Sequence, residues 1–453
     1  MDDIARFKMF CQLRSQIRGS GDHLIVGIDI AKDKHHAFFG TAKGQTLWRR
    51  LIFTNDLAGF NRLIEQVDTL KARHSLGQVV FGMEPTGNYH KPLIHWLTEQ
   101  GYLVVFVAGK AVKDNRELLD GRWDKNDTKD SANVADLISQ GKCLFYENPD
   151  ADILALRNLL SIRRHLKKET HRLRMRIRNG LLAKYFPEMD RHLGTCVTEN
   201  LAIVRWYLDP RKIAATDFDV FVRHVTTTDR GVRQLRRLRK IHDAAAWSIG
   251  VPVDAAAEHE ARILVDRFKA VEAELAAVME QIDSICRSMP SYRILLTIPG
   301  FGPYITPLVL SALANPLRFK SRKQVIRLAG LDLNASRSGK TSKQQVPVIS
   351  KKGDAELRYG LYQAALIASY HNDAFRRLYN RMLEGRQGER GIKTKARVKI
   401  AAKMLVIAWT MLKKSEPFNP GYLLAEPVHP RGNIDFVRDN LGPAIPMARG
   451  SNV

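Results

Sequence analysis

Short apolar runs alternate with segments of helical spacing in the first third of the chain, and this alternation restricts the fold more than any other feature. The runs Leu24–Ile30 and Gln78–Glu84 contain so few polar residues that they predict strands buried on both faces. Apolar residues three and four positions apart predict helices at 57–72 and 93–99. Strands that alternate with helices indicate an α/β sheet domain, which we place at 22–148. Further strands of this domain are predicted at 36–40, 47–53 and 103–107.

Four acidic residues stand out in this domain. Asp29 lies inside the first apolar strand and Glu84 ends the second, while Asp127 and Asp130 have the spacing of one face of a helix beginning near Asn126. A carboxylate in an apolar strand is costly unless it is paired or bound to a metal. Each acid taken alone favours an ordinary explanation, such as a strand end, a helix cap or a surface ion pair. Together they predict a site at one edge of the sheet for the Mg²⁺ ions of phosphoryl transfer.

The chain is strongly basic, with 72 Lys and Arg against 47 Asp and Glu and a formal net charge of +25. Such a charge predicts attraction to the phosphates of nucleic acids and an affinity that falls steeply with salt. Charge alone is also compatible with a ribosome-associated protein or with one that is merely basic. Combined with the buried acids, it favours metal-dependent chemistry on DNA or RNA.

Several classes of protein are disfavoured by the composition. The 4 cysteines show no CxxC spacing, so the sequence predicts neither a zinc site nor a disulfide framework. No uncharged apolar run reaches the roughly 18 residues that a membrane span needs, and the N-terminus lacks the pattern of a signal peptide. We therefore expect a cytoplasmic protein with no membrane partner.

Two long helices frame a middle region that we place at 151–290. The first has Arg and Lys residues between its apolar positions, which are Leu159, Ile162, Leu166, Leu173 and Ile177. The second has a heptad pattern from Leu264 to Ile285, which predicts an antiparallel hairpin with the first helix or a dimer contact. Between them the stretch 186–253 is less regular and matches no motif, so its role stays open. It carries a basic cluster of Arg230, Arg233, Arg236, Arg237, Arg239 and Lys240.

The third region, 291–416, is predicted to be mainly helical. A helix, a tight turn containing Gly300 and Gly302, and a second helix follow one another, and such a turn can present backbone N–H groups to a phosphate. The same kind of turn is common without any ligand. A polar segment rich in Ser, Lys and Gly follows, and helices are predicted at 355–370 and 396–413. The tail, 417–453, is rich in Pro and Gly and is expected to be extended or disordered.

The segments that carry the acids resemble the motifs of a known family. They are Gly27–Lys32, Met83–Tyr89 and Lys125–Asp130, and they are similar to the three acidic motifs of the DEDD-type insertion-sequence transposases, the bridge-RNA-guided serine recombinases. The resemblance runs from about Leu24 to Pro420. It takes in the Arg-rich helix and the segments 298–302 and 328–331. Ser131 stands where the family usually has Ala, which is a conservative change.

The resemblance has implications for fold, chemistry and partners. It implies an RNase H-like domain, similar to the Holliday-junction resolvases, then a coiled-coil linker and a mainly α transposase domain. The four acids would bind Mg²⁺, and Ser338, directly before Gly339, would be the nucleophile. Donor and target DNA would be selected by a bridge RNA, within a homo-oligomer that is a dimer or a tetramer. A prokaryotic protein of this kind would be associated with the nucleoid.

The serine segment has a physical argument of its own. A serine hydroxyl that attacks a phosphodiester conserves the bond as a phosphoserine, so that strands can rejoin without ATP. Gly339 would allow close approach to DNA, and Lys340 would neutralise phosphate charge. The residues alone favour an ordinary polar turn, and it is the resemblance that favours the nucleophile. Ser336 and Ser342 are alternative positions for the nucleophile.

Other basic residues are candidates for nucleic-acid contacts. Arg172 and Arg176 lie on the Arg-rich helix, and Lys352 and Arg358 follow the serine segment. Solvated surface charge is the alternative explanation for Lys352 and Arg358. His35 and His36 lie near Asp29, and we expect an exposed pair at a strand turn rather than metal ligands or a general base.

Two other functions are compatible with this pattern. The first is a metal-only nuclease or junction resolvase, in which water attacks the phosphate and the serine is structural. The second is a nucleic-acid-binding protein without catalytic activity. A covalent protein–DNA adduct distinguishes the recombinase from the nuclease, because hydrolysis forms no adduct. Mg²⁺-dependent strand cleavage excludes the protein without activity.

Overall fold

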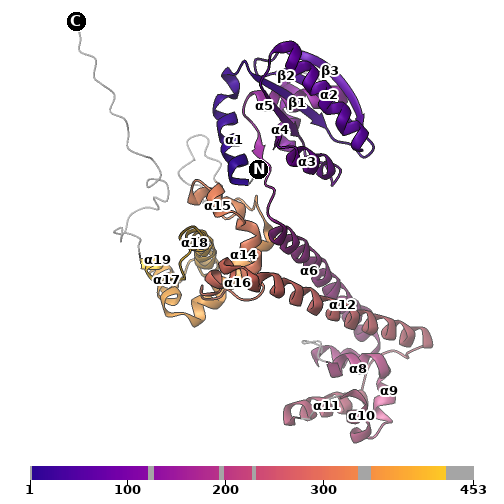
Figure 1. Cartoon of the computed structure of the whole chain (residues 1–453). Helices are drawn as coiled ribbons and strands as arrows, with labels where there is room; N and C mark the ends of the chain where they lie inside the picture. The colour runs from indigo at the N-terminus through magenta and orange to yellow at the C-terminus, as the bar shows by residue number, and fades with distance from the viewer. Residues whose placement is uncertain (1–2, 121–126, 193–197, 227–230, 335–347, 425–453) are drawn as a thin grey trace. The chain divides into compact units, whose positions relative to one another are not determined.

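The computed structural model describes residues 3–120, 127–192, 198–226, 231–334 and 348–424. Its contacts divide the chain into two compact units (Figure 1). Unit 1 comprises residues 1–282 and 313–320, and unit 2 comprises residues 283–312 and 321–453. Unit 1 contains a sheet module, a long helical hairpin and an insert of short helices.

The sheet module is built on a six-stranded sheet with the order β3-β2-β1-β4-β5-β6. The neighbours β1, β4 and β5 are parallel, β2 and β3 form an antiparallel meander beside β1, and β6 pairs antiparallel with β5. The α/β prediction is therefore confirmed, and the strands expected at 36–40, 47–53 and 103–107 are β2, β3 and β5. The bounds are β1 (His23–Asp29), β2 (Lys34–Thr41), β3 (Thr46–Thr54), β4 (Gln78–Met83), β5 (Leu103–Phe106) and β6 (Leu144–Phe145).

Helices cover both faces of this sheet. Leu24, Val26 and Ile28 of β1 belong to the core beneath α2 (Leu57–His74) and α3 (His90–Glu99). Ile25 belongs to the opposite core, beneath helices that lie on the other face. This double burial explains the continuous apolar run of β1. The helices of the second face are α1 (Asp3–Gln16) with η1 (Ile17–Gly19), α4 (Gly109–Asp120) and α5 (Asp127–Ser139).

The two long helices pair with each other in antiparallel orientation. Ion pairs join Glu169 of α6 (Ala151–Arg176) to Arg267 of α12 (Ala255–Ser288) at 2.8 Å, and Arg176 to Glu260 at 2.7 Å. The partner residue number falls along α12 as it rises along α6, which is the register of a hairpin. Of the two arrangements left open by the heptad pattern, the structure has the hairpin.

The buried seam of this hairpin differs in part from the predicted one. Phe268, Val271, Leu275 and Ile282 of α12 are buried, as the heptad pattern predicts. On α6 the prediction was wrong for Ile162, which is 46% exposed. The apolar residues buried in that half of α6 are Ile153, Leu156 and Leu160, which lie on the opposite side of the helix from Ile162.

The stretch between the long helices folds into a compact insert. Its short helices lie at one end of the hairpin (Figure 1). Their buried residues share one hydrophobic core with the adjoining ends of the two long helices. The two ends of the insert meet, since Val251 N donates to Lys184 O at 3.1 Å. The elements are η2 (Ile177–Leu182), α7 (Ala183–Tyr185), η3 (Pro187–His192), α8 (Thr198–Trp206), α9 (Pro210–Ala214), α10 (Phe218–Val225) and α11 (Val232–Ala245).

Unit 2 is mainly helical, as predicted. Small buried residues such as Ala364 and Ala365 let α16 pack closely against α18. The elements are α13 (Pro290–Leu296), α14 (Ile305–Leu313), α15 (Arg322–Leu328), β7 (Leu333–Asn334), β8 (Val348–Ile349), α16 (Ala355–His371), α17 (Asp373–Leu383), α18 (Ile392–Lys414) and α19 (Gly421–Leu424). The short η4 (Pro316–Arg318) belongs to unit 1.

The start of the predicted tail packs on unit 2. Phe418 N donates to Thr297 Oγ1 at 2.8 Å, and the Phe418 ring stacks on Phe375 with centroids 5.8 Å apart. Leu423 is 3% exposed. The expectation of an extended tail from Pro417 is therefore wrong for this stretch, because the sequence pattern did not show these aromatic and apolar contacts. Residues 425–453 lie outside the described residues.

No helix within the described ranges is long and apolar enough to cross a membrane.

Candidate active site and nucleic-acid contacts

Asp29 and Glu84 lie beside each other at the carboxyl end of the parallel strands. Ile28 of β1 pairs in register with Met83 of β4, and the two acids are the next residues on each strand. Neighbouring strands are about 4.8 Å apart, so the register brings the two backbones together at one edge of the sheet. Both side chains are half-buried. The register thus brings the backbones of both acids to one edge of the sheet, while their joint role in a metal site stays a prediction.

Glu84 also lies against the start of α4. A Cβ atom on Gly109 would come within 2.4 Å of Glu84 Oε1, so the carboxylate occupies the space that any side chain at 109 would need. Gly109 is the first residue of α4, where the helix dipole favours a negative charge. Sequence analysis did not single out Gly109, and a glycine at the start of a helix gives little signal by itself.

The third acid, Asp130, is carried by α5, which lies directly on two glycines of the sheet. Gly27 of β1 and Gly82 of β4 are partners in register. A Cβ on Gly27 would meet the Ser131 carbonyl oxygen at 2.2 Å, and one on Gly82 would meet Ile138 at 2.1 Å. The helix therefore approaches β1 next to Asp29, and Asp130 is 5% exposed. An isolated glycine in an apolar strand is the signal that would have indicated such a close approach.

Buried amides fix α5 against α4. Asn115 Nδ2 of α4 donates to Asn133 Oδ1 of α5 at 2.7 Å and to Asp136 Oδ2 at 2.8 Å. Asn133 Nδ2 donates in turn to Val112 O at 2.6 Å. Because buried amides are costly when they lack partners, this network specifies the position of α5. Asp127 is the first residue of α5, but its side chain lies outside the described part of the structure.

His35 supports the turn that follows Asp29. The prediction that His35 is exposed was wrong, because it is fully buried on β2 and its ring meets the Phe53 ring edge-on, with centroids 5.2 Å apart. Its Nδ1 accepts a hydrogen bond from Ala31 N at 3.2 Å, so the proton of the neutral ring is on Nε2. Burial lowers the pKa of His35, although the side chain of Asn55 opposes the shift. The neutral ring therefore holds the backbone after Asp29.

The described side chains alone do not complete a metal site. Among them, with Asp127 left out, no group of three or more His, Cys, Asp or Glu could hold a metal ion. The structure thus brings Asp29 and Glu84 together by strand register and Asp130 toward them through α5. It does not place the fourth acid.

The predicted serine segment is carried between two paired strands of unit 2. Ser338, Gly339 and Lys340 lie outside the described residues. Before and after this segment, β7 and β8 pair antiparallel, with Leu333 opposite Ile349. Below the strands Lys351 N donates to Gly330 O at 3.0 Å, so that both ends of the segment are held together at its base.

The two glycines of the 298–302 turn have different environments. Gly300 has φ +87°, and a Cβ there would meet Ala364 O at 2.4 Å, so packing on α16 requires glycine at this position. Among the described residues, no atom lies within 4 Å of a Cβ added to Gly302. Close packing therefore explains Gly300 without a ligand, whereas Gly302 stays available for contact with a phosphate.

The other residues predicted to contact nucleic acid differ in how firmly their side chains are fixed by neighbouring groups. Arg358 Nη1 donates to Ala329 O at 2.9 Å, which ties α16 to the turn after α15. The exposed Arg176 side chain is held by Glu260 of α12, whereas that of Arg172 lies 3.6 Å from Glu169. Lys352 is exposed. Arg172 and Lys352 are thus the cations of this set with the greatest freedom to meet a phosphate.

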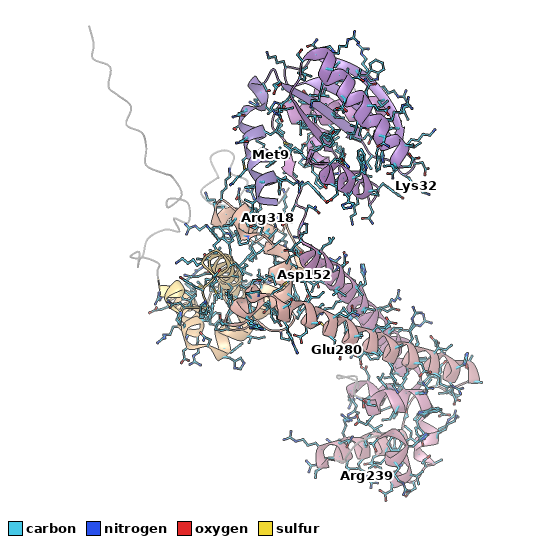
Figure 2. All side chains as sticks on the ribbon, in the orientation of Figure 1. Met9, Lys32, Asp152, Arg239, Glu280 and Arg318 are labelled. Carbon is cyan, nitrogen blue, oxygen red and sulfur yellow. The ribbon has the colours of Figure 1, made fainter. Side chains whose placement is uncertain are left out.

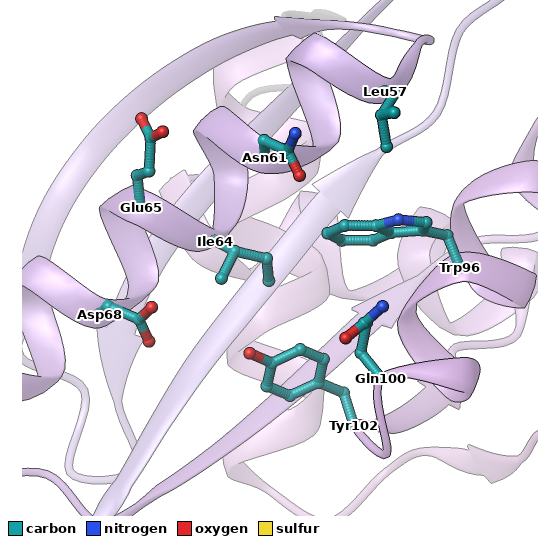
Figure 3. A pocket seen from close by; sticks show the side chains of 8 residues that line it. All are labelled: Leu57, Asn61, Ile64, Glu65, Asp68, Trp96, Gln100 and Tyr102. Atoms are coloured by element: carbon teal, nitrogen blue, oxygen red, sulfur yellow. The ribbon is translucent and has the colours of Figure 1, made fainter.

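A cleft lies between α2 and α3, and it contains none of the four acids (Figure 3). Trp96 and Tyr102 form one wall, and Glu65 and Asp68 of α2 face it. The pKa of Tyr102 is raised by burial and by the charge of Asp68. Two carboxylates next to aromatic rings disfavour a phosphate ligand here, so we do not assign this cleft to the nucleic-acid site.

Two family profiles match the chain. One, for DEDD transposases of the IS110 type and described as "Transposase", matches residues 26–187, and the other, described as "Transposase IS116/IS110/IS902 family", matches residues 292–380. The two matches cover more than half of the chain, including the acids of the sheet module and the serine segment of unit 2. The chain belongs to the IS110/IS116 family of transposases.

Individual relatives are similar over most of their length. The uncharacterized protein of insertion element IS116 from Streptomyces clavuligerus is 24% identical over 407 residues, which are 88% of this chain and 97% of the relative. The pilin gene-inverting protein of Moraxella lacunata is 24% identical over 400 residues, 87% of this chain and 97% of the relative. The IS110 protein of Streptomyces coelicolor is 23% identical over 399 residues, 86% and 94% of the two chains.

Proposed function

We propose that this transposase cuts and rejoins DNA with a serine nucleophile, assisted by Mg²⁺ at its acidic residues. The proposal is supported by the register of β1 and β4, which sets the backbones of Asp29 and Glu84 side by side, and by the packing on Gly27 of α5, which carries Asp130. The strand order, with an antiparallel meander beside parallel strands, supports an RNase H-like domain at 22–148. A coiled-coil region at 151–290 and a serine-bearing domain at 291–416 complete the proposed organisation.

The acids suit the metal by their chemistry. Asp29, Glu84, Asp127 and Asp130 offer carboxylate oxygens only, and these are the ligands that Mg²⁺ prefers. A bound Mg²⁺ would stabilise negative charge on the phosphate that reacts. The protein's own part is to hold the carboxylates in place, through the register of β1 and β4 and through the packing of α5 on Gly27.

Ser338 would attack the phosphorus of the scissile phosphodiester. A bond forms between Ser338 Oγ and phosphorus, the bond from phosphorus to one strand oxygen breaks, and that oxygen takes up the proton lost by the serine. Attack by the hydroxyl of another strand reverses these changes and releases the serine. Because the phosphoserine conserves the bond, the strands rejoin without a nucleotide cofactor. Lys340 and Lys352 would neutralise phosphate charge near the serine.

The partners follow from the same proposal. Donor and target DNA are the substrates, and a bridge RNA selects them within a homo-oligomer, either a dimer or a tetramer. The net charge of +25 supports a protein that holds more than one polyanion. The names of the Moraxella relatives support inversion of a DNA segment as one outcome of the reaction. RNA that copurifies with the protein would support the guide, and full activity of an RNA-free preparation would refute it.

The decisive experiment is a denaturing gel that detects a covalent protein–DNA adduct. The protein is expressed with its flanking RNA and mixed with the junction DNA of its element and Mg²⁺. Parent, Ser338→Ala and Asp29→Asn are compared, and two matched controls remove a serine or an acid outside the proposed set: Ser342→Ala and Asp68→Asn. Asp68 is a suitable control because it lies on α2 in the cleft of Figure 3, away from the acidic set.

We expect an adduct with the parent and with both controls, and none with Ser338→Ala or Asp29→Asn. Cleavage without an adduct that is indifferent to Ser338 would identify a metal-only nuclease. Loss of the adduct in Ser342→Ala but not in Ser338→Ala would move the nucleophile to the neighbouring serine. Cleavage by Asp29→Asn at the rate of the parent would refute the metal site.

A further inference from the structure

The insert contains a line of exposed cations that ends at an exposed tryptophan. Arg233, Arg236 and Lys240 of α11 are spaced three and four residues apart, so they lie on one side of the helix. Leu238 and Ile241 on the opposite side are fully buried in the core of the insert. We call the line formed by Arg233, Arg236, Lys240 and Trp247 the α11 stripe.

The cations of the α11 stripe are not neutralised within the described part of the chain. The neighbouring Arg237 is paired with Glu199 at 3.2 Å, and the guanidinium of Arg239, labelled in Figure 2, lies over the Phe218 ring at 3.4 Å. Arg233, Arg236 and Lys240, in contrast, are exposed, and no described carboxylate forms an ion pair with them. Asp243 lies along the same side, which still leaves an excess of positive charge on this face.

Two acids of the insert accept hydrogen bonds near these elements, Glu188 from the residues directly after Trp247 and Asp217 at the start of α10. Glu188 accepts from Ser248 Oγ at 2.7 Å and from Ile249 N at 3.1 Å, and Asp217 caps the first turn of α10. Burial lowers the pKa of His192, and the positive charges of Arg237, Lys240 and Arg191 lower it further. Positive charge therefore gathers at this side of the insert.

Trp247 exposes almost its whole side chain to solvent in the described part of the structure. Ala246 keeps helical dihedral angles and Trp247 N donates to Ala244 O at 3.2 Å, so the backbone continues the turn of α11 to Trp247, seven residues after Lys240. Trp247 is 87% exposed. Ile249, two residues later, is 82% exposed. Trp48 and Trp206 are each 46% exposed, so Trp247 presents far more of its ring to solvent than they do. A tryptophan in solvent next to a row of cations matches the chemistry of an unpaired nucleotide, which has an aromatic face and a phosphate.

We propose that the α11 stripe binds a single-stranded stretch of nucleic acid, with phosphates on Arg233, Arg236 and Lys240 and an unpaired base stacked on Trp247. At 1.5 Å per residue, the stripe from Arg233 to Trp247 is about 21 Å long. This length corresponds to about six phosphates at the spacing of one strand of a duplex. A base within a duplex is already stacked on both faces, so the tryptophan selects unpaired nucleotides.

Fluorescence anisotropy of the full-length protein tests this proposal. The probes are single-stranded RNA, single-stranded DNA and duplex DNA of about a dozen nucleotides, a length within the usual range of single-strand sites. The variants are Trp247→Ala, Trp247→Phe and the triple change of Arg233, Arg236 and Lys240 to Gln. Trp48→Ala is the control for removal of an exposed tryptophan. The control for the triple change replaces three exposed cations of the sheet module with Gln, namely Arg62, Arg73 and Lys91.

Trp247→Ala is expected to weaken single-strand binding on the order of 5- to 150-fold, the effect of removing one base–aromatic stack. Binding of the duplex should stay unchanged, and Trp247→Phe should retain most of the single-strand affinity. The triple variant should lower the slope of log affinity against log salt by about 2 for single strands. A larger loss with the RNA probe would identify an RNA as the ligand, and a larger loss with single-stranded DNA would identify a displaced DNA strand.

Two results would overturn the proposal. One is a Trp247→Ala variant that binds single strands as tightly as the parent, or loses affinity for duplex and single strands equally. The other is a triple variant whose salt slope does not differ from that of the control triple. The acids and Ser338 are intact in every variant, so this test is independent of the adduct assay. Either proposal can therefore fail while the other stands.

Discussion

Gly27 allows α5 to lie directly on β1, and Gly27→Ala is expected to lift that helix from the sheet. The added Cβ would be 2.2 Å from the Ser131 carbonyl oxygen, whereas ordinary contacts of a Cβ begin at 3.4 Å. The two backbones must therefore separate by about 1.2 Å, the difference between these distances. A flexible side chain could rotate away, but the obstructing atoms belong to the backbone of α5, so the helix itself has to move.

The size of the effect follows from this displacement. Overpacking of a core by one methyl group costs about 1–3 kcal/mol, and contact with backbone atoms favours the upper end of this range. Asp130 moves with the helix that carries it. Since a misplacement of about 1 Å can reduce a catalytic rate about 100-fold, adduct formation should fall by that order. Loss of activity should thus exceed what a modest loss of stability explains.

Hydrogen exchange and the adduct assay together test this prediction. In Gly27→Ala, amides of β1 and α5 should exchange faster than in the parent, while those of unit 2 should be unchanged. Gly19→Ala is the matched control, because an added Cβ at Gly19 meets no atom within 4 Å. If Gly27→Ala kept the exchange rates and the adduct yield of the parent, α5 would not be the element that positions Asp130, and this reasoning would be wrong.

Three further predictions concern other parts of the chain. Gly300→Ala should destabilise unit 2 by about 2–4 kcal/mol, because φ is +87° and the new methyl group meets a carbonyl of α16 at 2.4 Å. Gly302→Ala, whose Cβ would have no described atom within 4 Å, should leave the urea midpoint unchanged and lower only the affinity for DNA. Burial holds the pKa of His35 below its ordinary 6.5, so the unfolded chain takes up a proton that the folded chain does not. The contribution of His35 to the free energy of unfolding should therefore be complete above about pH 6.5 and should fall as the pH drops toward the pKa of the folded state. As the pH is lowered, the urea midpoint of the parent should decline more steeply than that of His35→Asn. Arg172→Gln should lower the salt slope of duplex binding by about 0.9, whereas Arg176→Gln should change it less because a carboxylate of α12 already holds that guanidinium; equal slopes would contradict this difference.

The sheet and the hairpin could be predicted because their signals are local and repeated. The apolar runs that became β1 and β4 follow from burial on both faces, and the heptads of α12 follow from contact with one neighbouring helix. The meeting of Asp29 and Glu84 could also be predicted, since parallel strands end at the same edge of a sheet. In each case the signal lies within one short segment of the sequence.

The burial of His35, the fold of the insert and the position of α5 depend on contacts that leave no periodic pattern in the sequence. His35 was expected to be exposed, but Phe53 covers it, and that contact arises only when β2 pairs with β3. The helices α9 and α10 are too short to show a clear period, so the insert looked irregular. The position of α5 depends on two glycines that face each other across β1 and β4. For Ser338, the residues alone favour a polar turn, and it is the family resemblance that favours the nucleophile.

The closure between Val251 and Lys184 has a consequence for how this chain can be re-engineered or diversified. Because the first and last residues of the insert lie next to each other, deleting the insert would hardly change the path of the remaining main chain. The same deletion would strongly destabilise the chain, because Val265 and Phe268 of α12 share a core with Phe221 of the insert and would become exposed to solvent. A workable exchange between relatives must therefore transfer the insert together with the adjoining ends of α6 and α12, including Phe268.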